Sequence, residues 1–199
     1  MRSLGGALAL GALLAVPAAA GPLEEGVDAY RAKEYAKAAE LWQPLAEQGN
    51  AVAQYQLGTL YMEGKGVKRD DATAFMWMQR AADQGDANAQ YNVAASYMEG
   101  LGVQKNEGEA ARWFGRAANQ GMVYAQVNLG LLYASGTGVQ QDNVEALKWL
   151  HLALFALPAG GARSDVSRAI VDVASKMDYV QKEQATKRER AWKATPETK

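Results

Sequence analysis

Residues 50–85 read NAVAQYQLGTLYMEGKGVKRDDATAFMWMQRAADQG, and residues 86–121 read DANAQYNVAASYMEGLGVQKNEGEAARWFGRAANQG. The two stretches carry glycine, tyrosine, alanine and tryptophan at the same places, and a third copy continues to residue 156. Gly64, Gly100 and Gly136 mark the common interval of 36 residues. A fixed period of this length is typical of solenoids, in which each repeat is one supersecondary unit stacked on its neighbours. The sequence therefore predicts three repeats over residues 50–156.

Each repeat is predicted to contain two helices. In the first repeat, Ala53, Leu57 and Tyr61 recur at helical spacing over residues 51–63 and define one apolar face. Gly64 follows directly and ends the helix, because glycine enters the left-handed backbone region without a steric penalty.

The second helix begins at a polar cap that recurs as Asp70, Asn106 and Asp142. Glu109 and Glu145 lie three residues after the last two caps, which predicts capping boxes in the second and third repeats. The apolar positions expected to face the preceding helix are Ala74, Trp77 and Ala81 in the first repeat.

Small residues on the packed face of the first helices predict close contact between helices. The position is Gly58 in the first repeat, Ala94 in the second and Gly130 in the third. Glycine inside a helix costs about 0.5–1 kcal/mol relative to alanine, so a close approach of a neighbouring helix explains its presence.

The combined pattern resembles the Sel1-like repeat family, a relative of the tetratricopeptide repeats. The residues that carry the resemblance are the small and aromatic positions of the first helix, the Gly-x-Gly-Val segment at residues 64–67, the polar cap and Trp77. The resemblance implies an all-α fold, a right-handed superhelical solenoid of antiparallel helix pairs that offers a binding surface to protein partners. The chain has no cysteine, unlike some secreted members of that family.

The chain before the array divides into two segments. Residues 1–20 combine Arg2, an uncharged Leu/Ala/Gly run and a small-residue ending, which predicts a secretory signal cleaved after Ala20 and a periplasmic or secreted protein. The alternative is a retained membrane anchor, since the uncharged stretch extends over residues 3–23; membrane contact is expected only through this segment. Residues 21–49 are expected to form a degenerate helix pair.

Residues 157–199 leave the repeat register and are expected to form capping helices with a frayed tail. Residues 164–175 have helix-like apolar spacing, and a terminal solenoid unit needs such a cap. The charged segment 179–192 is interpreted as a solvated helix held by Val180 and Trp192, with a basic docking arm as the alternative. Residues 195–199 are expected to be frayed.

The composition offers little support for nucleic-acid binding, cofactors or catalysis. Lys and Arg number 21 against 22 Asp and Glu, so no basic excess indicates a nucleic-acid partner. The absence of cysteine and the single His151 argue against a metal site, and the Gly-x-Gly pairs lack the third glycine and the preceding strand of a nucleotide-binding loop. No cofactor, metal site or catalytic residue is predicted.

A helical wheel places a second set of positions on the face of the first helices opposite the packed one. These positions are rich in amides, partly apolar and free of lysine and arginine, which favours an inner groove for a peptide. The candidate groove residues are Val52, Tyr55, Gln56, Thr59, Met62, Glu63, Asn88, Tyr91, Asn92, Met98, Glu99, Tyr124, Val127, Asn128 and Leu131.

The sequence therefore favours a non-enzymatic protein-binding module of the bacterial envelope, with a peptide segment or partner protein in this groove. The alternative is an envelope enzyme or a glycan-processing accessory protein, although no catalytic constellation supports it. Self-association through the ends of the array is a third hypothesis, and the sequence leaves the oligomeric state open.

Overall fold

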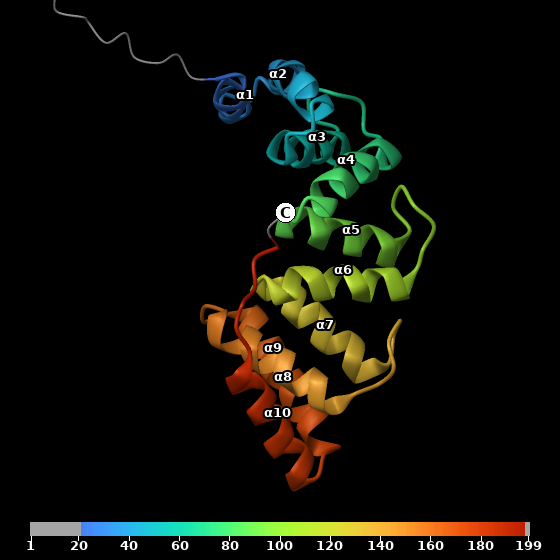
Figure 1. Cartoon of the computed structure of the whole chain (residues 1–199), viewed down its shortest axis with the longest axis vertical. Coiled ribbons are helices and arrows are strands. Elements are labelled where there is room, and N and C mark those ends of the chain that lie inside the picture. The colour runs from blue at the N-terminus through green and yellow to red at the C-terminus, as the bar shows by residue number, and fades with distance from the viewer. Residues whose placement is uncertain (1–20, 198–199) are drawn as a thin grey trace, which may run out of the picture.

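The computed structural model describes residues 21–197, and the expected signal segment, residues 1–20, lies outside them. The described residues form ten α-helices and no strand, which confirms the all-α solenoid (Figure 1). No helix in the described part of the chain is long and apolar enough to cross a membrane. The helices are α1 (Pro22–Arg31), α2 (Tyr35–Glu47), α3 (Ala51–Glu63), α4 (Asp71–Asp83), α5 (Ala87–Glu99), α6 (Glu107–Asn119), α7 (Val123–Ser135), α8 (Asn143–Ala156), α9 (Gly161–Ser175) and α10 (Tyr179–Ala191).

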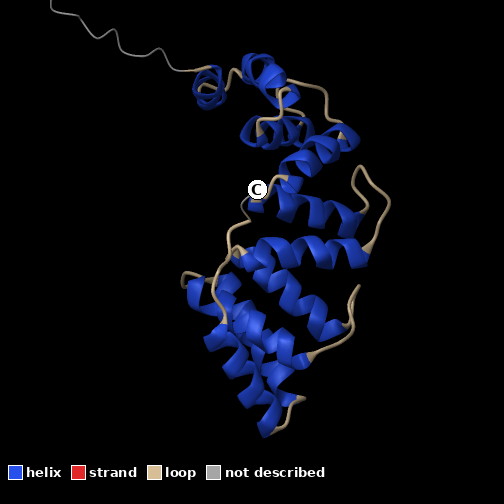
Figure 2. Cartoon of the chain, in the orientation of Figure 1, coloured by secondary structure: helices blue, strands red, loops and turns tan. Residues whose placement is uncertain are grey.

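The helices pack as consecutive pairs stacked in chain order. Within the repeats, α3 packs on α4, α5 on α6 and α7 on α8, and each pair also contacts the next one. In Figure 2 the longer loops inside the repeats lie along one edge of the stack. The stack therefore has two distinct edges, one formed by these loops and one by the short turns that join successive pairs.

Each first helix of the three repeats ends at a left-handed glycine, as predicted. Gly64, Gly100 and Gly136 have φ values of 67°, 76° and 73°. The loop then closes on the helix that it leaves: the amide of Asp70, for example, donates to the carbonyl of Tyr61 over 3.1 Å. These bonds fix where the second helix starts.

The predicted capping boxes form only in part. Asn106 and Asp142 do cap their helices, accepting bonds from the backbone amides of Glu109 and Glu145. The two glutamate side chains do not return to the cap, because Glu109 binds the neighbouring Arg112 and Glu145 binds Lys148. The predicted bond from each glutamate side chain back to the cap is therefore wrong.

The second glycine of each loop packs against the preceding helix pair. A Cβ on Gly102 would overlap the backbone of Asp71 at the start of α4, and one on Gly138 would overlap the backbone of Glu107 at the start of α6. Gly66 approaches the start of α2 in the same way, at Ala36. These glycines therefore join successive pairs, in addition to shaping the loop in which they occur.

The N-terminal pair has a much shorter connection between its helices. Only three residues separate α1 from α2, and the middle one, Lys33, adopts a left-handed φ of 63°. Trp42 is fully buried between the two helices and donates from Nε1 to the carbonyl of Leu23 over 3.2 Å. This pair thus packs like the repeats without their glycine-containing loop.

The last two helices cover the C-terminal end of the array. Val166 of α9 and Ala185 of α10 are buried against the core that α8 presents. Val180 is 58% exposed, so the expectation that it anchors α10 is wrong. Ion pairs with α8 help to hold α10, including one between Arg188 and Glu145 at 2.7 Å.

Candidate functional site

The candidate groove residues lie on α3, α5 and α7 and differ in accessibility. Several are open to solvent, and the others are half-buried between neighbouring helices. The exposed ones are Val52, Glu63, Asn88, Glu99, Tyr124 and Leu131. The half-buried ones are Tyr55, Gln56, Thr59, Met62, Tyr91, Asn92, Met98, Val127 and Asn128.

Most of the half-buried candidates contribute to the packing of the solenoid. The ring of Tyr91 meets that of Phe114 edge to face, with 5.4 Å between ring centroids. Met62 and Met98 pack against the same buried cluster. Asn128 donates from its side-chain amide to the carbonyl of Tyr124 over 2.9 Å, within its own helix. These side chains are therefore already engaged before any partner binds.

Tyr55 shows the electrostatic character of this face. Burial raises the pKa of its phenol above the ordinary value, and the nearby carboxylate of Asp86 raises it further. The side chains of Thr59 and Asn92 lower the pKa in part. The neutral phenol can donate a hydrogen bond.

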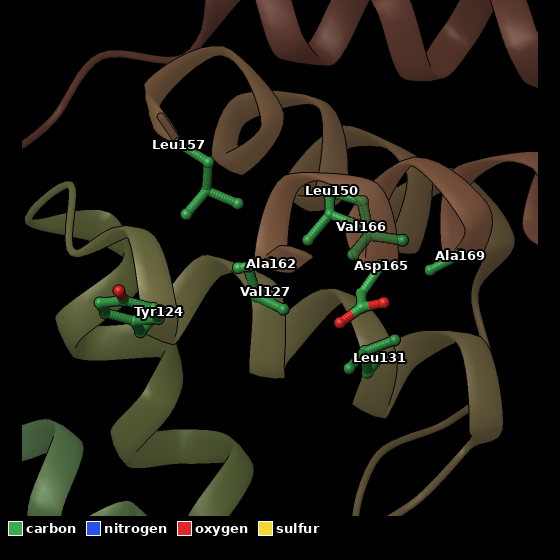
Figure 3. A pocket seen from close by; sticks show the side chains of 9 residues that line it. All are labelled: Tyr124, Val127, Leu131, Leu150, Leu157, Ala162, Asp165, Val166 and Ala169. Carbon is green, nitrogen blue, oxygen red and sulfur yellow. The ribbon is translucent and has the colours of Figure 1, made fainter. Parts of the chain in front are cut away.

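Three candidate residues line an apolar pocket at the C-terminal end of the array. Tyr124, Val127 and Leu131 of α7 form one wall of this cavity of about 200 Å³ (Figure 3). Tyr124 is 59% exposed and Leu131 44% exposed. The remaining lining residues are Leu150, Leu157, Ala162, Asp165, Val166 and Ala169, from α8, α9 and the turn between them.

The turn between α8 and α9 explains why the pocket lies here. Earlier pairs are joined by short turns such as 84–86, which contain a left-handed glycine. After α8 the chain instead continues through Leu157, whose backbone is extended, and Pro158 before α9 begins at Gly161. In Figure 3, Leu157 and Tyr124 lie at one end of the pocket and Asp165 lies near Leu131. Sequence reasoning missed the α9 wall because residues 157–199 leave the repeat register, although Val166 belongs to the predicted apolar spacing.

A second surface involves the C-terminal tail, and here the prediction of a frayed end needs correction. The amide of Thr195 donates to the carbonyl of Asn119 over 2.8 Å. Glu197 forms a two-pronged ion pair with Arg116, with a closest N···O distance of 2.5 Å, and accepts a bond from Gln90 Nε2 at 2.9 Å. The tail is therefore held against the array as far as Glu197.

Electrostatics favour the ionised form of Glu197 in this position. Hydrogen bonds from the Arg116 guanidinium lower the pKa of the Glu197 carboxyl below its ordinary value, and Gln90 lowers it further. In Figure 1 this segment runs from the end of α10 back along the stack toward α5. Trp192 starts the segment, and its ring meets that of Trp149 at a centroid distance of 6.1 Å. Local pattern could not show these contacts, because the partners are far apart in sequence.

Residues 21–197 contain no group of three or more His, Asp and Glu side chains placed to hold a metal ion. His151 pairs through Nδ1 with Glu189 Oε2 at 2.9 Å, and this contact joins α8 to α10.

The family model of the Sel1 repeat matches residues 23–50, 51–86, 87–122 and 123–154. The chain belongs to the Sel1 repeat family. The first match covers the N-terminal pair α1–α2, so the family model assigns this pair as a separate repeat. Sel1 repeats generally form non-catalytic scaffolds for protein–protein interaction.

Solved structures of Sel1 proteins resemble the chain over most of its length. A Sel1 repeat protein from Oxalobacter formigenes is 33% identical, with a TM-score of 0.68 over 80% of this chain and 62% of its own. A protective antigen of uropathogenic Escherichia coli that displays an SLR fold is 29% identical, with a TM-score of 0.50 over 85% of this chain and 44% of its own. The chain thus spans less than two thirds of the length of either protein. No curated protein matches the sequence.

Proposed function

We propose that this Sel1 protein is a non-enzymatic binding module that holds a short apolar peptide segment of a partner protein. The segment occupies the pocket between α7, α8 and α9 and continues over the exposed face of the first helices. The observation that carries the proposal is the exposure of Tyr124 and Leu131 at the mouth of this apolar pocket.

The chemistry of the pocket defines the kind of segment that fits. Covering exposed apolar surface gains about 25 cal/mol per Å², and tyrosine is among the residues that contribute most at binding surfaces. Asp165 also lines the pocket, and its carboxylate is ion-paired with Arg168 of the same helix. An apolar segment therefore suits this site best.

The proposed place of action is the bacterial envelope. The support is the signal-like pattern of residues 1–20 with its small-residue ending at Ala20. N-terminal sequencing of the protein recovered from the periplasm or the medium tests this assignment. A chain that starts at Gly21 supports it, whereas an uncleaved chain in the cytoplasm contradicts it.

The binding site is tested by capture of partners on immobilised protein carrying Leu131→Lys. The lysine places a charge at the pocket mouth, so a partner captured by the unchanged protein is expected to be lost. Phe155→Lys is the matched control, because Phe155 is 76% exposed on α8 and does not line the pocket. Capture that survives Leu131→Lys contradicts the proposal. Tyr91→Ala is a poor probe, since it removes the contact with Phe114.

A further inference from the structure

The site that holds Glu197 is built from residues of the second repeat. Arg116 lies over the ring of Trp113, with its guanidinium carbon 4.4 Å from the ring centroid. The guanidinium forms an ion pair with the Glu197 carboxylate. Gln90 is fully buried and donates to the same carboxylate. Gln120 donates to Gln90 Oε1 over 2.8 Å, which orients the Gln90 amide.

The first repeat contains the same arrangement 36 residues earlier. Among residues 21–197, no carboxylate occupies this copy of the site. Arg80 lies over the ring of Trp77 at 4.7 Å and is exposed. Gln54 is 3% exposed, and Gln84 donates to its Oε1 over 2.7 Å. Gln54 Nε2 donates to the carbonyl of Ala46, and its second N–H has no partner among residues 21–197. That free N–H corresponds to the one with which Gln90 holds Glu197.

The turn glycines show that the surface beside Arg80 is open. A Cβ on Gly85 would lie 2.7 Å from the carbonyl oxygen of Glu197, so the tail covers this turn. At the equivalent Gly49, with a similar φ of 94°, a Cβ would meet no described atom within 4 Å. The same turn is thus covered in one repeat and open in the other.

The third repeat lacks the arrangement, which makes the site specific to two repeats. Leu152 stands in the column of Arg80 and Arg116, and Ala156 stands in the column of Gln84 and Gln120. Neither can donate a side-chain hydrogen bond, so no carboxylate site forms there.

We propose that Arg80 and Gln54 bind the carboxylate of an aspartate or glutamate in an extended segment of a partner protein. The occupied copy shows the mode of binding: the backbone amide of Thr195 bonds to the end of α6, and the carboxylate two residues later reaches the arginine. The carbonyl of Asp83 occupies the equivalent place in the first repeat. The chain's own Glu197 is engaged at Arg116, so it does not fill the Arg80 site of the same molecule. This surface is separate from the apolar pocket.

The test uses the peptide acetyl-Ala-Thr-Pro-Glu-amide, which copies residues 194–197 and carries one carboxylate. It is titrated into ¹⁵N-labelled protein of residues 21–199, which contains all ten helices. We expect the Nε–Hε signal of Arg80 and the side-chain amide signals of Gln54 to shift. Arg80→Gln is expected to lower the affinity about tenfold or more, because hydrogen bonds to charged groups contribute about 1.5–3 kcal/mol.

Two controls make the outcome decisive. Arg112→Gln also removes an exposed arginine stacked on a tryptophan but lies outside the site, so it should leave the affinity unchanged. A peptide with glutamine in place of glutamate should cause no shift. The proposal is overturned if that peptide acts equally, if no shift occurs, or if only Arg116 and Gln90 respond. A Glu197-dependent dimer in sedimentation would instead assign the site to a second copy of the chain.

Discussion

Gly130 of α7 and Leu150 of α8 lie so close that a Cβ built on Gly130 would be 2.8 Å from Leu150 Cγ. The same Cβ would lie 3.2 Å from the carbonyl oxygen of Ala146, so the backbone of α8 limits the space as well. Gly58 meets Met78 in the same way in the first repeat. A hydrogen in place of a side chain therefore sets how closely the two helices of these pairs approach.

Gly130→Leu is expected to destabilise the third repeat by at least about 1–3 kcal/mol, the range for overpacking a well-packed core. Urea unfolding followed by circular dichroism measures the change. Gly115→Ala is the control, because a Cβ there would meet nothing within 4 Å and should stabilise α6 by about 0.5–1 kcal/mol. An unchanged unfolding curve for Gly130→Leu would refute the packing argument.

Gly102→Ala is expected to destabilise the protein more than Gly100→Ala. Both glycines have positive φ, at 70° and 76°, so both substitutions cost about 1–2 kcal/mol of backbone strain. Only the Cβ at position 102 would overlap the backbone of Asp71, whereas at position 100 the nearest atom is Lys105 Cβ at 3.5 Å. Equal midpoints of thermal unfolding for the two variants would contradict a joining role for Gly102.

Lys33→Gly is expected to stabilise the N-terminal pair by about 1 kcal/mol. Lys33 has a φ of 63°, a conformation that glycine adopts without the steric cost that a side chain incurs. The midpoint of thermal unfolding should rise. Lys33→Ala is the control, since it retains the strain and should give no comparable gain.

Acid is expected to release the C-terminal tail. Hydrogen bonds from Arg116 lower the pKa of Glu197, so docking is favoured fully above the ordinary glutamate pKa and is lost as the pH falls through the lowered value. Hydrogen exchange of the Thr195 amide, which is bonded to Asn119, should accelerate relative to the intrinsic rate in this range.

The matched variant for this measurement is Glu197→Gln, which lacks the titrating carboxyl. Its Thr195 amide should be less protected at neutral pH and should show little dependence on pH. Retention of the full pH response in this variant would assign the effect to another group.

The equivalent positions of the repeats predicted the structure well where it is determined by residues close together in the sequence. Residues 51–63 were expected to be helical and form α3 with the same bounds, because apolar spacing and Gly64 act within one helix. The capping boxes failed in part because Arg112 and Lys148 compete for the glutamates. Val180 was expected to hold α10 in place, whereas Ala185 is the residue of that helix that is buried.

The sequence could indicate only some features of the candidate site, for a related reason. The helical wheel assigned Tyr124 and Leu131 to the face opposite the packed one, and both side chains are exposed in the structure. It could not separate them from Tyr91, whose burial depends on Phe114 in the next helix. The α9 wall of the pocket and the docking of Glu197 on Arg116 depend on contacts between distant segments, which no local pattern encodes.

The contacts of Gly66, Gly102 and Gly138 bear on how such an array can grow. Each glycine approaches backbone atoms of the preceding pair, and backbone atoms are the same whatever side chains that pair carries. A duplicated segment of 36 residues would therefore carry its own contact glycine, and this glycine could pack against the backbone of whichever pair precedes it. The length of this chain can change by whole repeats without redesign of the junctions, while the exposed side chains of each copy remain free to diverge.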